Sequence, residues 1–553
     1  MHTLEPHDAA AERWDALVVG TGMGGATLGH SLARAGWKVL FCEKGRAPRA
    51  DALKGEYAET FFSPPAHPSA AHGDVLRRAG RWTDVVDDIS GGRPRRFIPF
   101  IGSGTGGSSA LYGMAMERFF PVDFTPGRGH PRIDGANAPD DWPVAYEEMA
   151  PFYASAERLY GVRGGADPLR PDAAALRPAP PYTAGGERLA RQFEAQGLHP
   201  YRLPTACEYV PGCQSCQGYL CPKDCKNDSA RACLTPALAE HGAALIDECE
   251  VVRLRASRRA VEAVECRHRG VPLALRARFV FLAAGALATP VLLLRSASPE
   301  WPGGLANESG LVGRNLMRHL VDLYAVDVGT PADSRVKELA FNDLYWRDGV
   351  KLGTVQSFGR FPPLEVVMQA LFNDVREGAL PWMLPLMRLA GPLMRPELTR
   401  LIERRVTLAT TLEDLPYATN RVAPSAGNAG GIALEYRPGA YELDRTQRFR
   451  ELMRAALAPL AFRQIPQAQK NERIAHVCGT CRFGEDPHTS VLGPDCRAHG
   501  LENLYVVDSS FFPTSGGTNP SLTIAANALR VAMGLAAAPL DGAAAATAPG
   551  EVA

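Results

Sequence analysis

Three segments far apart in the chain share one pattern of apolar and polar residues. Residues 15–45, 276–296 and 503–535 each begin with a short apolar run, pass through a turn, and continue with apolar residues at helical spacing. Short continuous apolar runs are typical of parallel strands that are buried on both faces. The pattern therefore predicts an α/β fold in which one sheet takes strands from all three segments.

Residues 323–469 show a different pattern. Apolar residues predict strands at 321–328 and 431–436, and helical stretches lie around them. Such a mixture favours a sheet covered by helices. We therefore expect a second domain, of the α+β class, in this part of the chain.

The first turn carries the pattern G-x-G-x-x-G at Gly20, Gly22 and Gly25, directly after an apolar run and before a helical pattern. In a dinucleotide-binding fold the first glycine permits a tight turn, the second lets the backbone approach a pyrophosphate, and the third allows close packing of helix and strand. The next predicted strand leads to Glu43, whose carboxylate can accept hydrogen bonds from the hydroxyls of a ribose. A glycine-rich helix start without a ligand would leave Glu43 unexplained, so we expect a dinucleotide site.

A second glycine-rich segment, residues 102–113, follows a loop-rich connection. Its small residues permit close approach of the backbone and leave N–H groups free for a contact to phosphates or to a flavin ring. A flexible surface loop is the alternative interpretation. Because a nicotinamide enzyme seldom needs two such segments, the pair favours a tightly held FAD over NAD. The predicted cofactor-binding residues here are Gly102, Gly104, Gly106, Gly107 and Ser108.

Composition is that of an ordinary globular protein and narrows the range of partners. Of 553 residues, 46% are apolar and 22% are charged, and 60 basic residues balance 60 acidic ones. This balance gives no electrostatic reason to expect nucleic acid or an anionic membrane, so a small molecule is the expected partner. The absence of a long apolar run and of a secretory pattern predicts a cytoplasmic protein with reduced cysteines. Residues 539–553 are low in complexity and are expected to be disordered.

Four further stretches complete a set of motifs: residues 279–296, 311–319, 412–422 and 476–519. Together with the first glycine-rich turn, and in the same order along the chain, they resemble the motifs of the glucose–methanol–choline (GMC) flavoprotein oxidoreductases. The last stretch is similar to the catalytic H-x-x-G-T segment of that family and ends in N-P-x-L-T at a predicted helix start.

The resemblance implies a discontinuous, Rossmann-like FAD-binding domain with an inserted α+β substrate-binding domain built on a mainly antiparallel sheet. The implied FAD-binding domain takes residues 12–150, 228–322 and 470–538, and the substrate-binding domain takes residues 151–227 and 323–469, with a cysteine-rich loop at 207–233. Two positions depart from the family pattern, because Tyr112 stands where asparagine is usual and Phe483 stands where methionine is common. Both concern the surroundings of the flavin.

Oxidation of an alcohol requires a group that takes the hydroxyl proton while hydride leaves the carbon for the flavin. The resemblance gives the role of general base to His476, and to Asn519 a hydrogen bond that orients the same oxygen. It also places Asp508, Asn519 and Pro520 at the cofactor, with the helix after Pro520 presenting its N-terminus to the flavin pyrimidine. His319 and the other histidines are expected to be structural or exposed.

Four cysteines lie close together in the spacing C-x2-C-x4-C-x3-C, and the candidate metal ligands are Cys213, Cys216, Cys221 and Cys225. Thiolates at such spacing can hold an iron–sulfur cluster or zinc. Some GMC dehydrogenases carry an iron–sulfur centre in this region with another spacing, and other members have a loop without metal, so free or paired thiols are the alternative. Cys478 and Cys481 are expected to be small buried thiols, with a redox pair as the other interpretation.

The sequence thus predicts FAD-dependent oxidation of a small alcohol, with oxygen, a quinone or a redox partner as the electron acceptor. The cysteine-rich segment also resembles that of bacterial GMC enzymes which oxidise the 6′-hydroxyl of aminoglycoside precursors; acids facing the pocket, such as Glu413 and Asp414, would suit such cationic substrates. Two alternatives are a non-redox lyase or decarboxylase on the same scaffold, and an electron-transfer subunit built around a cysteine-bound cluster. Residues 380–394, apolar and interrupted by proline, are expected to form a lid or wall of the substrate pocket, rather than a membrane-touching patch or a buried loop.

Overall fold

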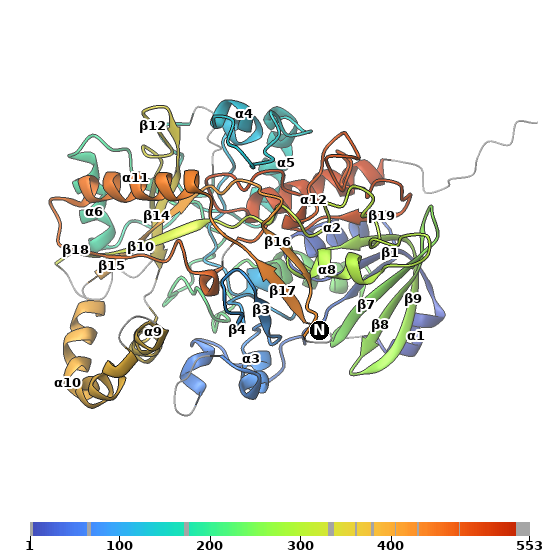
Figure 1. Ribbon diagram of the computed structural model, residues 1–553, viewed down its shortest axis with the longest axis horizontal. Coiled ribbons are helices and arrows are strands. Elements are labelled where there is room, and N and C mark those ends of the chain that lie inside the picture. The colour runs from blue at the N-terminus through green and yellow to red at the C-terminus, as the bar shows by residue number, and fades with distance from the viewer. Residues whose placement is uncertain are drawn as a thin grey trace, which may run out of the picture.

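The computed structural model describes residues 4–62, 68–170, 176–329, 337–359, 362–377, 381–403, 405–427, 431–474 and 476–537. Within these ranges the chain forms two large sheets, one towards the right and one towards the left of Figure 1, with helices packed against both. Residues 539–553, which were predicted to be disordered, lie outside the described ranges.

The first sheet draws its strands from distant parts of the chain, as the sequence pattern predicts. Its strands are β1 (Arg13–Val19), β2 (Val39–Cys42), β6 (Ala244–Ile246), β7 (Cys249–Ala256), β8 (Val261–His268), β9 (Val271–Leu282) and β19 (Leu504–Val506). They follow the order β6-β2-β1-β9-β8-β7, and β19 pairs with β9. The pairs that involve β1, β2, β6 and β19 are parallel, whereas β7, β8 and β9 form an antiparallel meander at one edge.

Three helices pack together against this parallel sheet: α2 (Met23–Arg34), α5 (Tyr146–Leu159) and α12 (Ser521–Ala536). The hydroxyl groups of Tyr153 on α5 and Thr523 on α12 are hydrogen-bonded at 2.8 Å. Gly22 precedes α2 and Pro520 precedes α12, and both residues line the same cavity. The two helices therefore begin at one site, although their sequences lie at opposite ends of the chain.

The second sheet is antiparallel at every pairing, which confirms the predicted α+β domain. Its six strands, in spatial order, are β18 (Phe462–Ile465), β10 (Leu320–Asp327), β15 (Arg405–Leu412), β14 (Gly353–Gly359), β11 (Leu339–Phe341) and β5 (Tyr201–Arg202). Helices α6 (Ala184–Glu194) and α11 (Ala440–Leu457) lie along this sheet (Figure 1) and share its apolar core. Phe193 of α6 and Phe449 of α11 are buried in that core, because the apolar residues of each helix recur on one face.

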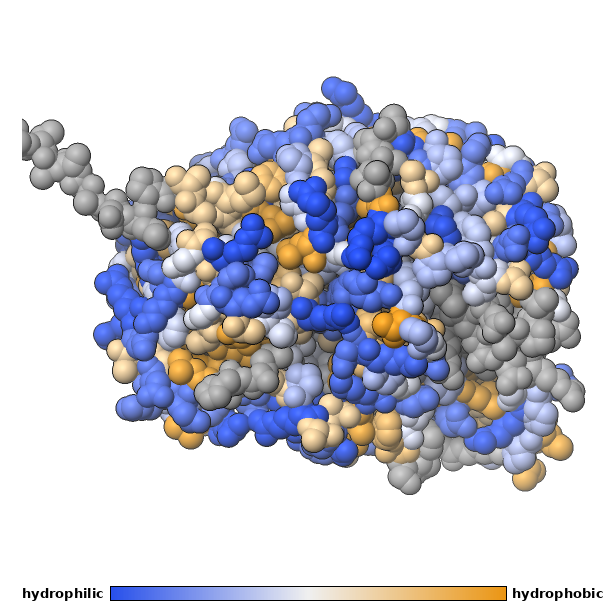
Figure 2. Space-filling model, turned by 180° about the vertical axis from the view of Figure 1, so that it is seen from behind, coloured by the Kyte–Doolittle hydropathy of each residue, from blue (hydrophilic) through white to orange (hydrophobic). Residues whose placement is uncertain are grey.

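Smaller elements join the two sheets. Strands β16 (Arg421–Pro424), β17 (Ile432–Glu435), β3 (Val86–Asp88) and β4 (Arg95–Phe97) form a four-stranded sheet, and β12 (Trp346–Arg347) and β13 (Val350–Lys351) form a hairpin. The remaining α-helices of the described chain are α1 (Pro6–Ala11), α3 (Gly73–Arg78), α4 (Pro126–Gly129), α7 (Thr235–Glu240), α8 (Ala288–Arg295), α9 (Leu364–Glu377) and α10 (Leu384–Glu403). The face shown in Figure 2 is mostly hydrophilic, with hydrophobic residues in small separate groups.

Helices α9 and α10 project from the second sheet as a pair (Figure 1). α10 continues as one helix through Pro392 and Pro396, and its side chains at Leu389 and Leu393 are 79% and 82% exposed. Across the described ranges, no helix is both long enough and apolar enough to pass through a membrane.

Candidate active site

One cavity of about 980 Å³ lies between the glycine-rich turns of the first sheet and the strands of the second sheet. Its walls include Gly22, Glu43 and Asp508 from the first sheet's connections, and Gln356 and Thr411 from the second sheet. Ligand sites of α/β proteins commonly lie in such crevices at the carboxyl ends of parallel strands. α9 adds Val366, Val367 and Leu371 to the wall and α10 adds Leu398. Of the two projecting helices, α9 and Leu398 of α10 thus contribute to the apolar lining, and the described residues of 380–394 do not.

The first glycine-rich turn has the geometry that its sequence predicts. Gly20 has φ +99°, and a Cβ at that position would lie 2.5 Å from the carbonyl oxygen of Ala283. A Cβ on Gly22 would meet no atom within 4 Å, because this residue faces the open cavity at the start of α2. A helix N-terminus with open space before it suits the pyrophosphate of a dinucleotide. Gly25 does not line the cavity and packs against the carbonyl oxygen of Gly20.

Glu43 joins the two glycine-rich segments. Its Oε2 accepts hydrogen bonds from the N–H of Thr21 at 3.0 Å and from the hydroxyl of Thr21 at 2.6 Å, and its Oε1 accepts from the N–H groups of Gly45 and Gly104. Burial raises the pKa of the Glu43 carboxyl, and these hydrogen bonds partly offset that effect. A carboxylate has about four acceptor positions, and these four hydrogen bonds occupy them, so Glu43 holds the two glycine-rich segments together and its predicted contact to a ribose stays a prediction.

The second glycine-rich segment divides between the cavity and the protein interior. Gly102, Gly107 and Ser108 line the cavity, whereas Gly104 donates to Glu43 and Gly106 donates to the hydroxyl of Thr21 at 3.3 Å. The second segment is therefore hydrogen-bonded to the first turn and to Glu43 through Gly104 and Gly106, while Gly102, Gly107 and Ser108 face the cavity.

Asp508, Asn519 and Pro520 all line the cavity. Asp508 accepts hydrogen bonds from the N–H of Gly285 at 2.8 Å and from the hydroxyl of Thr289 at 2.5 Å, so it ties the end of β19 to the turn after β9. α12 begins at Ser521, directly after Pro520, as the sequence predicts. Its N-terminus, with the partial positive charge of the helix dipole, opens onto the ligand space.

His476 lines the cavity and is held by His319, which lies 157 residues earlier in the chain. The Nδ1 atoms of the two rings are 2.8 Å apart, and the Nε2 of His319 is 2.8 Å from the carbonyl oxygen of Gly516. Since a carbonyl only accepts, the Nε2 of His319 carries a proton, and its Nδ1 is then the acceptor for the N–H of His476. The Nε2 of His476 is left with a free lone pair, which is the state that a general base requires.

Electrostatics keep His476 uncharged. Burial lowers its pKa well below the ordinary histidine value. The charge of Lys337, and the charge that His319 carries whenever it is itself protonated, lower that pKa further. Its backbone has φ +57°, a left-handed conformation that is uncommon outside glycine and that recurs at functional sites.

Asn519 is oriented in the same way by a residue from the second sheet. The side-chain N–H of Gln356, on β14, donates to the Oδ1 of Asn519 at 2.7 Å. The amide nitrogen of Asn519 is therefore the group left to donate into the cavity. Neither His319 nor Gln356 was identified from sequence, because each acts through a partner that is distant in the chain.

Residues 514–519 form the Asn519 loop, and bonds to its surroundings fix it along its length. Trp142 donates to the hydroxyl of Thr514 at 2.9 Å, His319 bonds the carbonyl oxygen of Gly516, and the N–H of Gly517 donates to the hydroxyl of Tyr345 at 3.0 Å. A site whose supporting residues are held by such bonds is preorganised for its ligand.

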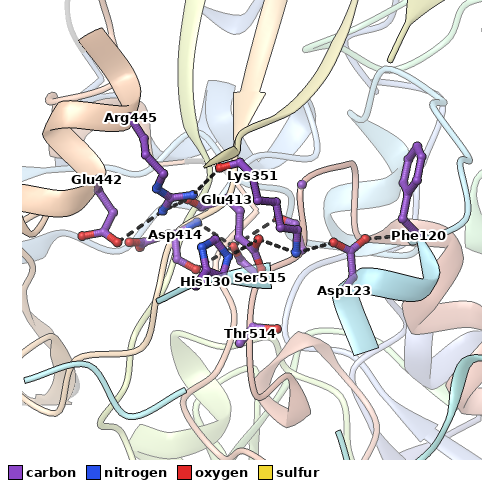
Figure 3. Close-up of polar contacts among 12 residues, drawn as sticks. Phe120, Asp123, His130, Lys351, Glu413, Asp414, Glu442, Arg445, Thr514 and Ser515 are labelled. Atoms are coloured by element: carbon purple, nitrogen blue, oxygen red, sulfur yellow. Dashed lines mark hydrogen bonds and ion pairs between the residues drawn. The ribbon is translucent and has the colours of Figure 1, made fainter. Parts of the chain in front are cut away.

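A cluster of fully buried charges lies next to this loop (Figure 3). The Nζ of Lys351 is 2.6 Å from an oxygen of Asp123 and 2.5 Å from an oxygen of Glu413, and the Nε2 of His130 is 2.8 Å from the same oxygen of Glu413. Burial alone would raise the pKa of Glu413, but Lys351 and His130 hold that pKa well below its ordinary value. Tyr345 donates to Asp123 at 2.6 Å, so the cluster also supports the Asn519 loop.

The expectation that Glu413 and Asp414 face the pocket is not met. Neither residue lines the cavity, and both are fully buried. Glu413 is committed to Lys351 and His130, whereas Asp414 accepts from the N–H of Arg318 at 3.0 Å and from the hydroxyl of Tyr436 at 2.8 Å. Two adjacent acids in a sheet-edge turn looked available from sequence because their buried cationic and hydroxyl partners are distant in the chain.

The cysteine-rich loop brings five thiols into a chain. The Sγ atoms of Cys207 and Cys213, of Cys213 and Cys225, and of Cys225 and Cys221 are separated by 3.6, 3.5 and 3.6 Å. Cys207, Cys213 and Cys225 converge closely enough to hold a metal ion, so Cys207 joins the predicted ligands, while Cys216 contacts Cys221. The metal site stays a prediction. Cys478 and Cys481 are buried, and burial raises the pKa of both thiols.

Comparison with known proteins identifies the family of this chain. Family models described as GMC oxidoreductase match residues 186–321 and 420–528. The chain is 31% identical over 562 residues to the 6‴-hydroxyparomomycin C oxidase of Streptomyces lividus, covering 96% of this chain and 93% of that protein. The chain belongs to the GMC oxidoreductase family. Like other members, it is an FAD-dependent enzyme that oxidises a CH–OH group.

Two further similarities support the family assignment and the fold. This GMC oxidoreductase is 29% identical over 543 residues to the paromamine 6′-oxidase of Streptomyces fradiae, covering 95% of this chain and 91% of that protein. The crystal structure of pyridoxine 4-oxidase from Mesorbium loti matches the fold with a TM-score of 0.62 at 20% identity, covering 94% of this chain and 99% of that chain.

The residues of this GMC oxidoreductase fit FAD. The open space at Gly22, the helix N-terminus behind it and a cavity of about 980 Å³ suit a pyrophosphate and a ring system. Bound FAD supplies the acceptor for a hydride. The second glycine-rich segment and the start of α12 would hold it from two sides.

Proposed function

We propose that this GMC oxidoreductase oxidises a primary or secondary hydroxyl of a sugar-like alcohol, with His476 as the general base and Asn519 as the group that orients the hydroxyl oxygen. The observation that carries the proposal is the bond between His319 and His476, because it leaves the Nε2 of His476 free on the cavity side. A base that is neutral and positioned before substrate binds needs no further proton transfer to become active.

Each step follows from the chain's own groups. The substrate hydroxyl lies between the Nε2 of His476 and the side-chain N–H of Asn519. His476 takes the hydroxyl proton, and the hydrogen bond from Asn519 stabilises the charge that develops on the oxygen as the carbonyl forms. Apolar residues of α9 line the same cavity as Asn519, and an apolar lining limits the water around a bound substrate.

A sugar-like substrate is supported by the relatives and by the size of the cavity. The relatives named above are oxidases of paromamine and of hydroxyparomomycin C. A cavity of about 980 Å³ has room for a substrate ring in addition to part of a flavin. The cysteine cluster is not required for this reaction.

The test is an anaerobic panel of alcohols mixed with the FAD-loaded enzyme. We expect primary hydroxyls of sugars and polyols to bleach the oxidised flavin band and to yield the aldehyde. Turnover of a substrate with no change in the flavin band would favour the lyase or decarboxylase alternative and would contradict the proposed oxidation. Repeating the mixing in air then shows whether oxygen restores the band.

A further inference from the structure

A buried lysine faces the end of the cavity that holds the proposed catalytic pair. Lys337 is only 3% exposed, lines the cavity, and lies close enough to His476 for its charge to lower the pKa of that histidine. No hydrogen bond or ion pair joins it to another residue that the structure describes. A buried ammonium without a hydrogen-bonded partner is costly, and burial accordingly lowers the pKa of Lys337 to about 8 against the opposing effect of the Glu117 carboxyl. A ligand oxygen in the cavity would supply the missing partner.

Two amide oxygens with no partner lie in the same region. The Oε1 atoms of Gln217 and Gln356 are buried, and no group of the described chain donates to either. Both residues line the cavity, and Gln356 is the residue that orients Asn519. Both oxygens are closed off from the cavity in the conformation described, so a ligand hydroxyl bonds to either one only after its amide rotates. With that rotation, one ammonium donor and two carbonyl acceptors match a substrate that carries several hydroxyl groups.

Gly113 leaves room for the polar groups of Lys337 and Gln217 to approach the same point. A Cβ at Gly113 would lie 2.4 Å from the Oε1 of Gln217 and 2.7 Å from the Nζ of Lys337. The two polar groups therefore converge on one point, which only a glycine leaves open.

The carboxylates of the cavity wall do not balance Lys337. Among the described lining residues, Glu43 and Asp508 accept hydrogen bonds from the glycine-rich and strand-end turns, Glu59 pairs with Arg81, and Asp84 and Glu250 pair with Lys44. Burial lowers the pKa of Lys337 to about 8, although the Glu117 carboxyl behind the wall raises it, so Lys337 is mainly charged at pH 7 and the charge beside His476 is then positive.

We propose that Lys337, Gln217 and Gln356 form a substrate subsite that selects polyhydroxylated alcohols without a positive charge, with sugar acids bound more tightly than neutral sugars. The inference rests on the proposed alcohol oxidation and narrows its substrate class. It predicts that this enzyme disfavours amino sugars such as paromamine as substrates, because an ammonium group on the reacting ring would face the positive charge of Lys337.

Three ligands test the subsite: glucosamine, glucose and gluconate, which share a primary hydroxyl and differ in charge. Their dissociation constants are measured from the spectral change of bound FAD in His476→Ala, in which turnover is suppressed. We expect gluconate to bind at least about tenfold more tightly than glucosamine, with glucose between them. Equal binding, or tighter binding of glucosamine, would overturn the inference.

Variants assign the preference to Lys337. In the His476→Ala background, Lys337→Met is expected to reduce the gluconate preference to about threefold or less, and Gly113→Ala, which displaces both polar groups, should do the same. Lys38→Met, at an exposed pair with Glu12, removes an equal charge and should leave the preference unchanged. If one of the two pocket variants, Lys337→Met or Gly113→Ala, loses FAD, the other one provides the test. If the preference for gluconate persists in a folded pocket variant that retains FAD, residues other than Lys337 cause it and the inference is wrong.

The same experiment separates the inference from the proposed function. If gluconate binds most tightly and glucosamine most weakly, but no ligand reduces the flavin of the wild-type enzyme, the result contradicts alcohol oxidation and supports the subsite. If the flavin is reduced rapidly and glucosamine binds most tightly, the result supports alcohol oxidation and contradicts the subsite.

Discussion

At the scale of single residues, the site works through two polar pairs. His319 fixes which nitrogen of His476 carries the proton, and Gln356 fixes which end of the Asn519 amide faces the cavity. In both pairs a supporting residue decides the chemical state of the residue that we propose to contact the substrate. Gln356 lies on β14 and His319 lies directly before β10, so residues of the second sheet and at its border orient the proposed catalytic pair.

Replacing His319 tests the tautomer argument. His319→Phe removes the acceptor for the N–H of His476, and we expect flavin reduction to slow by about ten- to hundredfold. His319→Gln, whose carbonyl can accept the same proton, should retain more of the rate. The measurement is stopped-flow flavin reduction at saturating alcohol.

The pH profile distinguishes positioning from a general structural loss. A base acts when it is unprotonated. Because the pKa of His476 is low, the rate of flavin reduction in the wild-type enzyme should not change between neutral pH and pH 6.5, and it should fall only below pH 6.5. Because His319 contributes to that low pKa, its removal should move the acid limb to higher pH. His488→Ala, at an exposed histidine, is the control and should leave both rate and profile unchanged. An unshifted acid limb in His319→Phe would argue against the pairing.

At the scale of elements, the Asn519 loop depends on buried charges between β13, the turn after β15 and the residues around Asp123. Lys351 on β13 lies between two carboxylates, and all three side chains are fully buried. Buried ion pairs add little relative to an apolar core, but removing one partner leaves the others without compensation. The cluster therefore makes the loop position sensitive to a single substitution.

Lys351→Met should destabilise the protein by about 3–5 kcal/mol, because Asp123 and Glu413 would remain buried without a cation. The measurement is thermal unfolding followed by the release of FAD fluorescence. Arg259→Ala removes an exposed ion pair with Glu502 and should cost less than about 1 kcal/mol. Similar melting temperatures for the two variants would mean that the cluster contributes no more than a surface pair.

At the scale of the whole molecule, local and long-range features differ in how far sequence predicts them. The glycine turn at Gly20 and the helix after Pro520 were predicted because each depends on neighbours within a few dozen residues. Glu43 was predicted to contact a ribose, and its bond to Gly104, 61 residues away, was not predicted. His319, Gln356 and Lys337 were not predicted, because their roles depend on how the second sheet packs against the first; the partners of the first two are 157 and 163 residues away. Glu413 shows the opposite error, since an acid that looks free in sequence is neutralised by Lys351 and His130.

The central claim is that His476 takes the proton of the alcohol. His476→Ala tests this claim most directly. His476→Ala leaves the glycine turns, Glu43 and α12 in place, so FAD should remain bound. The rate of anaerobic flavin reduction by a saturating primary alcohol should fall by about two orders of magnitude or more. Near-normal reduction in an FAD-loaded His476→Ala enzyme would show that another group is the base.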